Sequence, residues 1–106
     1  MDNSYLNYHA EAIKNYVSPW LPLVCGNIAG QTEKDEMPAV IITTVGGLVT
    51  VVYNPLDLYD VYFVGDYENK TAENIYADEL GKTILSLVLG KENAANMLKE
   101  LEKYVK

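Results

Sequence analysis

Hydrophobic positions at the start of the chain recur at helical spacing. They are separated by four, three, four and three residues, and comprise Leu6, Ala10, Ile13, Val17 and Trp20. This spacing places them on one side of an α-helix. Pro19 disfavours helical backbone at the preceding residue. The pattern therefore predicts a first helix over 5–20, with a boundary near Ser18.

The middle of the chain changes to the pattern of β-strands. Three apolar runs rich in β-branched and aromatic residues follow one another, at 39–45, 48–53 and 58–64. Gly46-Gly47, between the first two runs, is typical of a two-residue hairpin turn because both glycines tolerate positive φ. A proline-containing turn, 54–57, precedes the third run. We expect a three-stranded meander here, and another short strand at 23–25.

The last third returns to helical spacing. Apolar residues predict a helix over 71–89, ended by Gly90, and a final helix over 92–104. Gly81 lies inside the first of these helices and predicts a close approach of this helix to the sheet. The polar segments 31–36 and 65–70 are expected to be loops, with 31–36 exposed and mobile.

This order of elements predicts the α+β class. We expect one domain over 1–106, with an antiparallel sheet of three to four strands, an N-terminal helix and two C-terminal helices packed on it. A chain of 106 residues that is 49% hydrophobic is long enough to bury a core. It has no apolar run long enough to span a bilayer and no basic signal-peptide start, so we expect a protein made in the cytosol.

The net charge and the scarcity of cysteine and histidine limit the functions that the chain can have. The formal net charge of −7 disfavours binding to nucleic acid through phosphate contacts. Cys25 and His9 are the single cysteine and histidine, which excludes an intrachain disulfide and a zinc site of the usual composition. A Cys–His nucleophile pair can be drawn, but no orienting group accompanies it, and Cys25 is expected to be a small buried residue. The sequence predicts no catalytic residue, cofactor or metal.

Carboxylates in the second half of the chain allow three interpretations. They could act in acid/base chemistry or bind a divalent metal, they could imitate a row of phosphates, or they could simply be solvated. Six fall in expected turns or on an outer helix face, which favours solvation: Asp57, Asp66, Glu68, Glu73, Asp78 and Glu79. Asp60 differs because it lies in mid-strand among apolar neighbours. We expect a lysine or a backbone amide as its partner.

The hairpin around Gly46-Gly47 is the best candidate for an interaction site. The run 48–53 is apolar and β-prone, so it is either the centre of the sheet or a strand covered by another subunit. The nine tyrosines fit either the rim of the core or a wet protein interface. The candidate subunit-interface residues are Gly46, Gly47, Val49, Val51, Tyr53, Asp60 and Tyr62.

Four segments together resemble the tail terminator (tail completion) proteins of long-tailed bacteriophages. A short helix ends near Leu21-Pro22, and an apolar strand runs from Pro38 into Val45-Gly46-Gly47. A strand with alternating Asp and aromatic residues follows at 59–65, and an alanine-bearing segment begins at Thr71 after a polar loop. The resemblance covers roughly 8–89.

The resemblance implies a structural role without catalysis. Tail terminators form a six-membered ring on the tail tube, stop its polymerisation and join it to the head connector. For this chain it implies a hexameric homo-oligomer, tail-tube and head-connector partners, no direct contact with nucleic acid or membrane, and a place in a virion assembled in the bacterial cytoplasm.

Two other functions fit the sequence. One is a small acidic inhibitor or antitoxin-like protein that binds a host nucleic-acid enzyme, which predicts carboxylates spaced along one face. The other is a small enzyme or ligand-binding domain, which predicts a deep pocket holding Asp60, His9 or several tyrosines.

Overall fold

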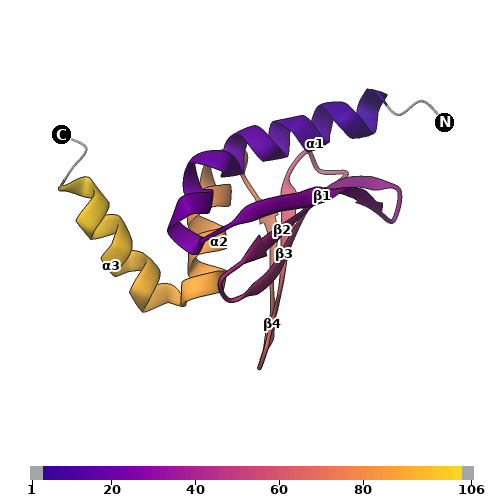
Figure 1. Cartoon of the computed structure of the whole chain (residues 1–106). Helices are drawn as coiled ribbons and strands as arrows, with labels where there is room; N and C mark the ends of the chain where they lie inside the picture. The colour runs from indigo at the N-terminus through magenta and orange to yellow at the C-terminus, as the bar shows by residue number, and fades with distance from the viewer. Residues whose placement is uncertain (1–3, 104–106) are drawn as a thin grey trace.

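A computed structural model describes residues 4–103. Its single sheet is antiparallel, with the five strands in the order β1-β2-β3-β4-β5, and helices cover one of its faces (Figure 1). The strands are β1 (Asn27–Lys34), β2 (Met37–Thr44), β3 (Gly47–Tyr53), β4 (Tyr59–Gly65) and β5 (Asn69–Ile75). The helices are α1 (Ser4–Val17), η1 (Ser18–Val24), η2 (Ala77–Glu79), α2 (Leu80–Leu89) and α3 (Lys91–Glu102). The α+β class is confirmed.

The three central strands follow the predicted meander, and β3 lies at the centre of the sheet. The turn between β2 and β3 is displaced by one residue from the prediction. Thr44 pairs with Gly47, so the two turn residues are Val45 and Gly46, and Gly47 begins β3. The Thr44 hydroxyl closes this turn by donating to the Gly47 carbonyl at 2.7 Å and accepting from the Gly47 amide at 3.2 Å.

Two outer strands were missed, which makes the sheet five-stranded instead of three- to four-stranded. Residues 31–34, expected to be a loop, belong to β1, and only Asp35 and Glu36 form the turn. All six residues of 31–36 are exposed, as expected. Residues 71–75, expected to start a helix, belong to β5. Both segments lie at sheet edges, where one strand partner suffices and polar side chains remain in water.

The short strand expected at 23–25 is not formed. Leu23 and Val24 lie in η1, a 3₁₀-helix that contains two prolines. Cys25 follows with φ of 52° and is exposed, so the expectation of a buried cysteine is wrong. Its left-handed backbone ends η1 and allows the amide of Gly26 to donate to the Leu21 carbonyl at 2.7 Å.

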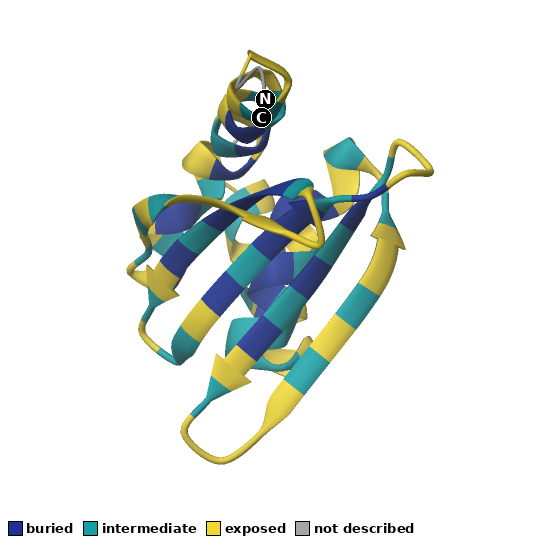
Figure 2. Ribbon diagram, turned by 90° about the vertical axis from the view of Figure 1, so that its right-hand side faces the viewer, coloured by how far each residue is buried: buried dark blue, intermediate teal, exposed yellow. Residues whose placement is uncertain are grey.

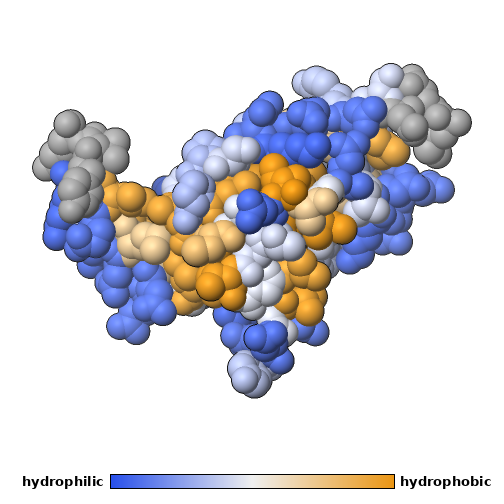
Figure 3. Space-filling model, viewed as in Figure 1, coloured by the Kyte–Doolittle hydropathy of each residue, from blue (hydrophilic) through white to orange (hydrophobic). Residues whose placement is uncertain are grey.

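The helices begin and end at residues that disfavour continuation. α1 ends at Val17, before Ser18 and Pro19, as predicted. The helix expected over 71–89 begins only at Leu80 and ends before Gly90. Both C-terminal helices were expected to pack on the sheet, but only α2 does so, whereas α3 extends away from it and packs on α2. The expected end of the last helix at Tyr104 lies outside the described residues. In Figure 3, hydrophobic surface at the centre of the molecule continues along one side of α3.

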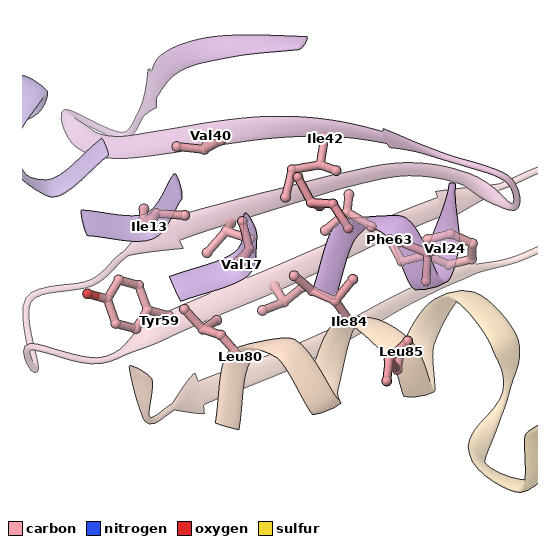
Figure 4. Packing of buried hydrophobic residues seen from close by; sticks show 14 of the residues in the cluster. Ile13, Val17, Val24, Val40, Ile42, Tyr59, Phe63, Leu80, Ile84 and Leu85 are labelled. Atoms are coloured by element: carbon pink, nitrogen blue, oxygen red, sulfur yellow. The ribbon is translucent and has the colours of Figure 1, made fainter. Parts of the chain in front are cut away.

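The core lies between the sheet and the layer of α1, η1 and α2 (Figure 4). The helices contribute buried side chains that face the three central strands, among them Ile13 and Val17 of α1 and Ile84 of α2. The strands contribute alternate residues, since successive side chains point to opposite faces. These residues are Val40, Ile42, Val49, Val51, Tyr59, Val61 and Phe63.

Gly81 is required by a contact between two elements of the helical layer. A Cβ at this position would lie 2.3 Å from three ring atoms of Trp20. The indole of η1 therefore lies directly against the backbone of α2. The expectation that Gly81 allows the helix to approach the sheet is wrong, because the close neighbour is the tryptophan of η1.

Candidate interaction surfaces

The face of the sheet opposite the helices carries a second set of side chains, which we call the open face. Strand pairing aligns them in rows across the sheet. One row is Thr43, Leu48 and Val64, the next is Ile41, Thr50 and Tyr62, and the third is Ala39, Val52 and Asp60. Figure 2 looks onto this face, and no helix lies in front of it.

The open face is most exposed where its apolar residues approach the β2–β3 turn. Leu48 and Val64 are 47% and 53% exposed, and Val45 in the turn is 68% exposed. We call these three residues the aliphatic band. Leu48 and Val64 are paired on neighbouring strands, so their side chains are adjacent. The helical layer does not cover them.

The opposite end of the open face is covered in part by its own chain. Lys34, at the end of β1, places its ammonium group 3.5 Å from the ring centre of Tyr62 in β4. This cation–π contact crosses β2 and β3. Lys34 also borders two hollows of about 340 and 220 Å³, one shared with Val64 and Thr71 and the other with Met37 and Asp60. Ala39 and Val52 are buried beneath this region.

The predicted interface residues are divided between the two faces. Val49 and Val51 lie in the core and have no exposed surface. Tyr53 also points to the helix-covered side, where it packs with the aromatic residues of α1. Asp60 and Tyr62 lie on the open face. The sequence could not separate the two sets, because both faces of β3 carry apolar residues.

Close contacts with neighbouring elements explain why glycine is present at both positions of the hairpin. Gly47 has φ of +148°, and a Cβ there would lie 2.1 Å from the Val64 carbonyl oxygen. The close approach of β3 to β4 therefore requires glycine at this position. A Cβ on Gly46 would lie 3.3 Å from Val88 of α2.

Asp60 belongs to a polar network around Asn54, a buried residue after β3. The Asn54 side-chain amide donates to Asp60 at 3.0 Å and to Asn74 at 2.9 Å. Its carbonyl oxygen accepts from the amides of Leu56 and Leu58. The backbone amide of Asn74 also donates to Asp60, at 3.0 Å. The Asp60 carboxylate thus joins the β3–β4 turn to the bulge in β5.

A second exposed apolar surface lies on α1. Tyr5, Tyr8, Ala12 and Tyr16 follow each other at spacings of three, four and four residues, which places them on a stripe beside the buried one. We call these four residues the tyrosine surface. Tyr8 is 72% exposed and Tyr16 is 46% exposed. This surface lies at the end of the strands opposite the aliphatic band.

The rings of the tyrosine surface are held by further aromatic contacts. His9 stacks on Tyr53 with 3.8 Å between ring centres and meets the edges of Tyr5 and Tyr8 at 4.7 and 5.1 Å. Tyr16 lies 6.3 Å from Tyr59. The Tyr53 hydroxyl donates to Asp57, which with burial raises the pKa of Tyr53 to about 12. Burial raises the pKa of Tyr59, and the nearby Tyr16 and Asp57 add to this effect.

His9 and Cys25 do not form a catalytic pair. His9 packs on Tyr53 at the end of β3. Cys25 lies near the start of β3, because the carbonyl of the preceding Val24 accepts a hydrogen bond from the amide of Val45 in the β2–β3 turn. The six steps of β3 between these places span roughly 20 Å. Within residues 4–103, no three side chains of His, Cys, Asp or Glu are grouped to hold a metal ion. No helix in this range is long and apolar enough to cross a membrane.

The carboxylates highlighted by the sequence are spread over the molecule. Asp57 lies in the β3–β4 turn and Asp66 in the β4–β5 turn, at opposite ends of the strands. Glu73 lies in β5 and not on a helix, so the expected helical position is wrong for this residue. Asp78 and Glu79 form part of η2.

Comparison with known proteins found no relative. No protein family, no curated protein and no solved structure matches the chain.

Proposed function

We propose that this protein is a non-enzymatic structural subunit that assembles into a ring, in the manner of the tail terminators of long-tailed bacteriophages. In this role it would close the tail tube in an assembling virion and present a surface to the head connector. The observation that best supports the proposal is the aliphatic band, an exposed apolar site that lies outside the closed core.

The energetics favour a protein partner for the band. Leu48 and Val64 each retain about half of their surface in contact with water. Covering the remainder would contribute roughly 1 kcal/mol for each residue. A sheet with helices on one face is a two-layer structure, and a neighbouring subunit can supply a cover for the other face.

The position of the band suits a ring better than a symmetric dimer. The band lies at one end of the open face, while the hollow bordered by Met37 and Asp60 lies at the other end of the same face. Contacts between different patches on successive copies are heterologous and close into rings when the rotation permits. A hexamer would repeat the same modest contact six times.

The acidic-inhibitor alternative has less support. It requires carboxylates aligned on one face, whereas Asp57 and Asp66 lie at opposite ends of the sheet. An enzyme would need a pocket with grouped reactive side chains. One hollow on the open face is bordered by Lys34, Tyr62 and threonines, and the other by Asp60, Tyr53 and Tyr62. The Asp60 carboxylate already accepts hydrogen bonds from Asn54 and Asn74, which favours a structural role for it.

Native mass spectrometry over a wide concentration range, with electron microscopy of large species, tests the proposal. Rings of about six subunits are expected for the wild type. Leu48→Lys should remain folded and become monomeric, because a charge would be buried in the contact. Asn96→Lys on exposed α3 adds the same charge elsewhere and should still form rings. A wild-type protein that remains monomeric at every concentration would contradict self-assembly into a ring.

A further inference from the structure

We infer that the outer side of α1 is a docking site for an arginine-bearing, positively charged segment of another protein. The site is the tyrosine surface together with the hollow beside it. The inference does not depend on ring formation, since the aliphatic band lies at the other end of the sheet.

The shape of the site fits one extended side chain. Tyr8 and Tyr16 lie two helical turns apart, about 12 Å along the axis, and small Ala12 lies between them. The hollow measures about 580 Å³, and its polar lining includes Asn7, Glu11 and Asn15. A planar guanidinium placed over Ala12 would have a tyrosine ring on either side and a carboxylate within its reach.

The site is ordered before a partner arrives. Tyr8 is held against His9 and Tyr16 against Tyr59. His9 is itself stacked on Tyr53 from β3. Rings fixed in this way lose little conformational freedom on binding, so more of the contact energy remains as affinity.

The charges at this end of the molecule select a cationic partner. The elements that surround the tyrosine surface carry four carboxylates, Glu11, Asp57, Asp78 and Glu79. On α1 itself the lysine is Lys14, which already contacts Glu11 at 3.1 Å and Gln31 at 3.0 Å. Two other elements packed on α1 add Lys34, which lies on the Tyr62 ring, and Lys82. All 8 basic residues of the chain are lysines, and its net charge is −7. An arginine at this site must therefore come from another protein.

Other occupants fit the site less well. A second copy of this surface would bring Glu11 to face an equally acidic patch, which is unfavourable. Nucleic acid and anionic lipid would be repelled for the same reason. Tyrosine and arginine are the residues most enriched at the energetic centres of protein interfaces, which favours an arginine-bearing protein segment.

Peptide titration tests the inference. The probes are a short arginine–serine peptide, a lysine–serine peptide of the same length and charge, and a glutamate–serine peptide. Binding is measured by isothermal titration calorimetry at low and physiological salt. We expect the arginine peptide to bind at least about threefold more tightly than the lysine peptide, because guanidinium stacks on tyrosine and ammonium does so less well.

Variants locate the binding site. Tyr8→Ala combined with Tyr16→Ala should weaken arginine-peptide binding about tenfold or more, and Glu11→Gln about threefold. Tyr67→Ala removes an exposed tyrosine in the β4–β5 turn and should leave binding unchanged. The single variants Tyr8→Phe and Tyr16→Phe keep the ring and should retain most of the affinity.

Several outcomes would overturn the inference. They are absence of binding, equal affinity for the lysine peptide, or equal loss in Tyr67→Ala, since the last two indicate general attraction to an acidic protein. Loss of self-association in the double tyrosine variant would assign the surface to a second copy instead. Leu48→Lys should leave peptide binding intact, so this inference and the proposed ring can fail separately.

Discussion

The two faces of the sheet are made by the same strands but differ in what covers them. Along β3, Val49 and Val51 point into the helical layer and are fully buried, whereas Leu48 on the other face is about half exposed. All three side chains are aliphatic. The comparison shows that what covers a position, and not residue type, decides whether an apolar residue serves stability or is free for assembly.

The largest expected effect comes from placing a charge on the covered face. Val51→Lys buries an ammonium group in a closed apolar core, where no carboxylate can pair with it. We expect a loss of about 4 kcal/mol or more in the free energy of unfolding, enough to prevent folding. Leu48→Lys on the same strand should cost less than about 1 kcal/mol, since its side chain reaches water. Chemical denaturation of both variants, followed by circular dichroism, measures the difference.

A smaller loss of stability is expected at the end of β3, where the polar residue Asn54 is buried. Asn54→Ala removes an acceptor from the amides of Leu56 and Leu58 and a donor to Asp60. Leaving these groups unpaired should destabilise the fold by about 2–3 kcal/mol. Asn93→Ala removes a single exposed hydrogen bond in α3 and serves as control. An equal loss in both variants would contradict a special role for the Asn54 network.

Gly81 tests how tightly the elements on the covered side of the sheet are packed. Gly81→Ala would place a methyl group against the Trp20 ring, so the indole or α2 must shift. Overpacking costs about 1–3 kcal/mol, partly offset by the better helix propensity of alanine. Gly30→Ala has open space around its Cβ and should change stability by less than about 0.5 kcal/mol. Thermal unfolding of the two variants measures the difference in stability, and tryptophan fluorescence reports whether the Trp20 ring has moved.

The smallest effect concerns Tyr53, at the edge of the covered face. Its pKa is raised from 10.0 to about 12 because its hydroxyl donates to Asp57. The folded state therefore holds this proton more tightly than the unfolded chain. The resulting stabilisation is fully present below the ordinary pKa and is lost as the pH rises towards the folded value. In Asp57→Asn, a difference titration of tyrosinate absorbance should show one tyrosine ionising at lower pH than in the wild type.

The candidate site could be predicted from the sequence only in part. The hairpin was expected from its pair of glycines and lies one residue away from the predicted place. Asp60 and Tyr62 were placed on one face of their strand because successive side chains point to opposite faces, and they do share the open face. Val49 and Val51 were named as interface candidates with the centre of the sheet as the alternative, and they lie in the core; the sequence could not decide because β3 is apolar on both faces. The tyrosine surface was missed because its stripe on α1 lies beside the core stripe, and spacing alone does not show where the buried side ends.

The sequence by itself determined the α+β class, the first helix with its end before Pro19, and the three central strands, since each has a strong local signal. The tertiary structure alone decided the outer strands β1 and β5. Their polar side chains carry no strand pattern, and they become strands because β2 and β4 offer unpaired backbone groups beside them. It also decided that Trp20 meets Gly81 and which face of the sheet remains open, because these depend on where elements distant in sequence pack.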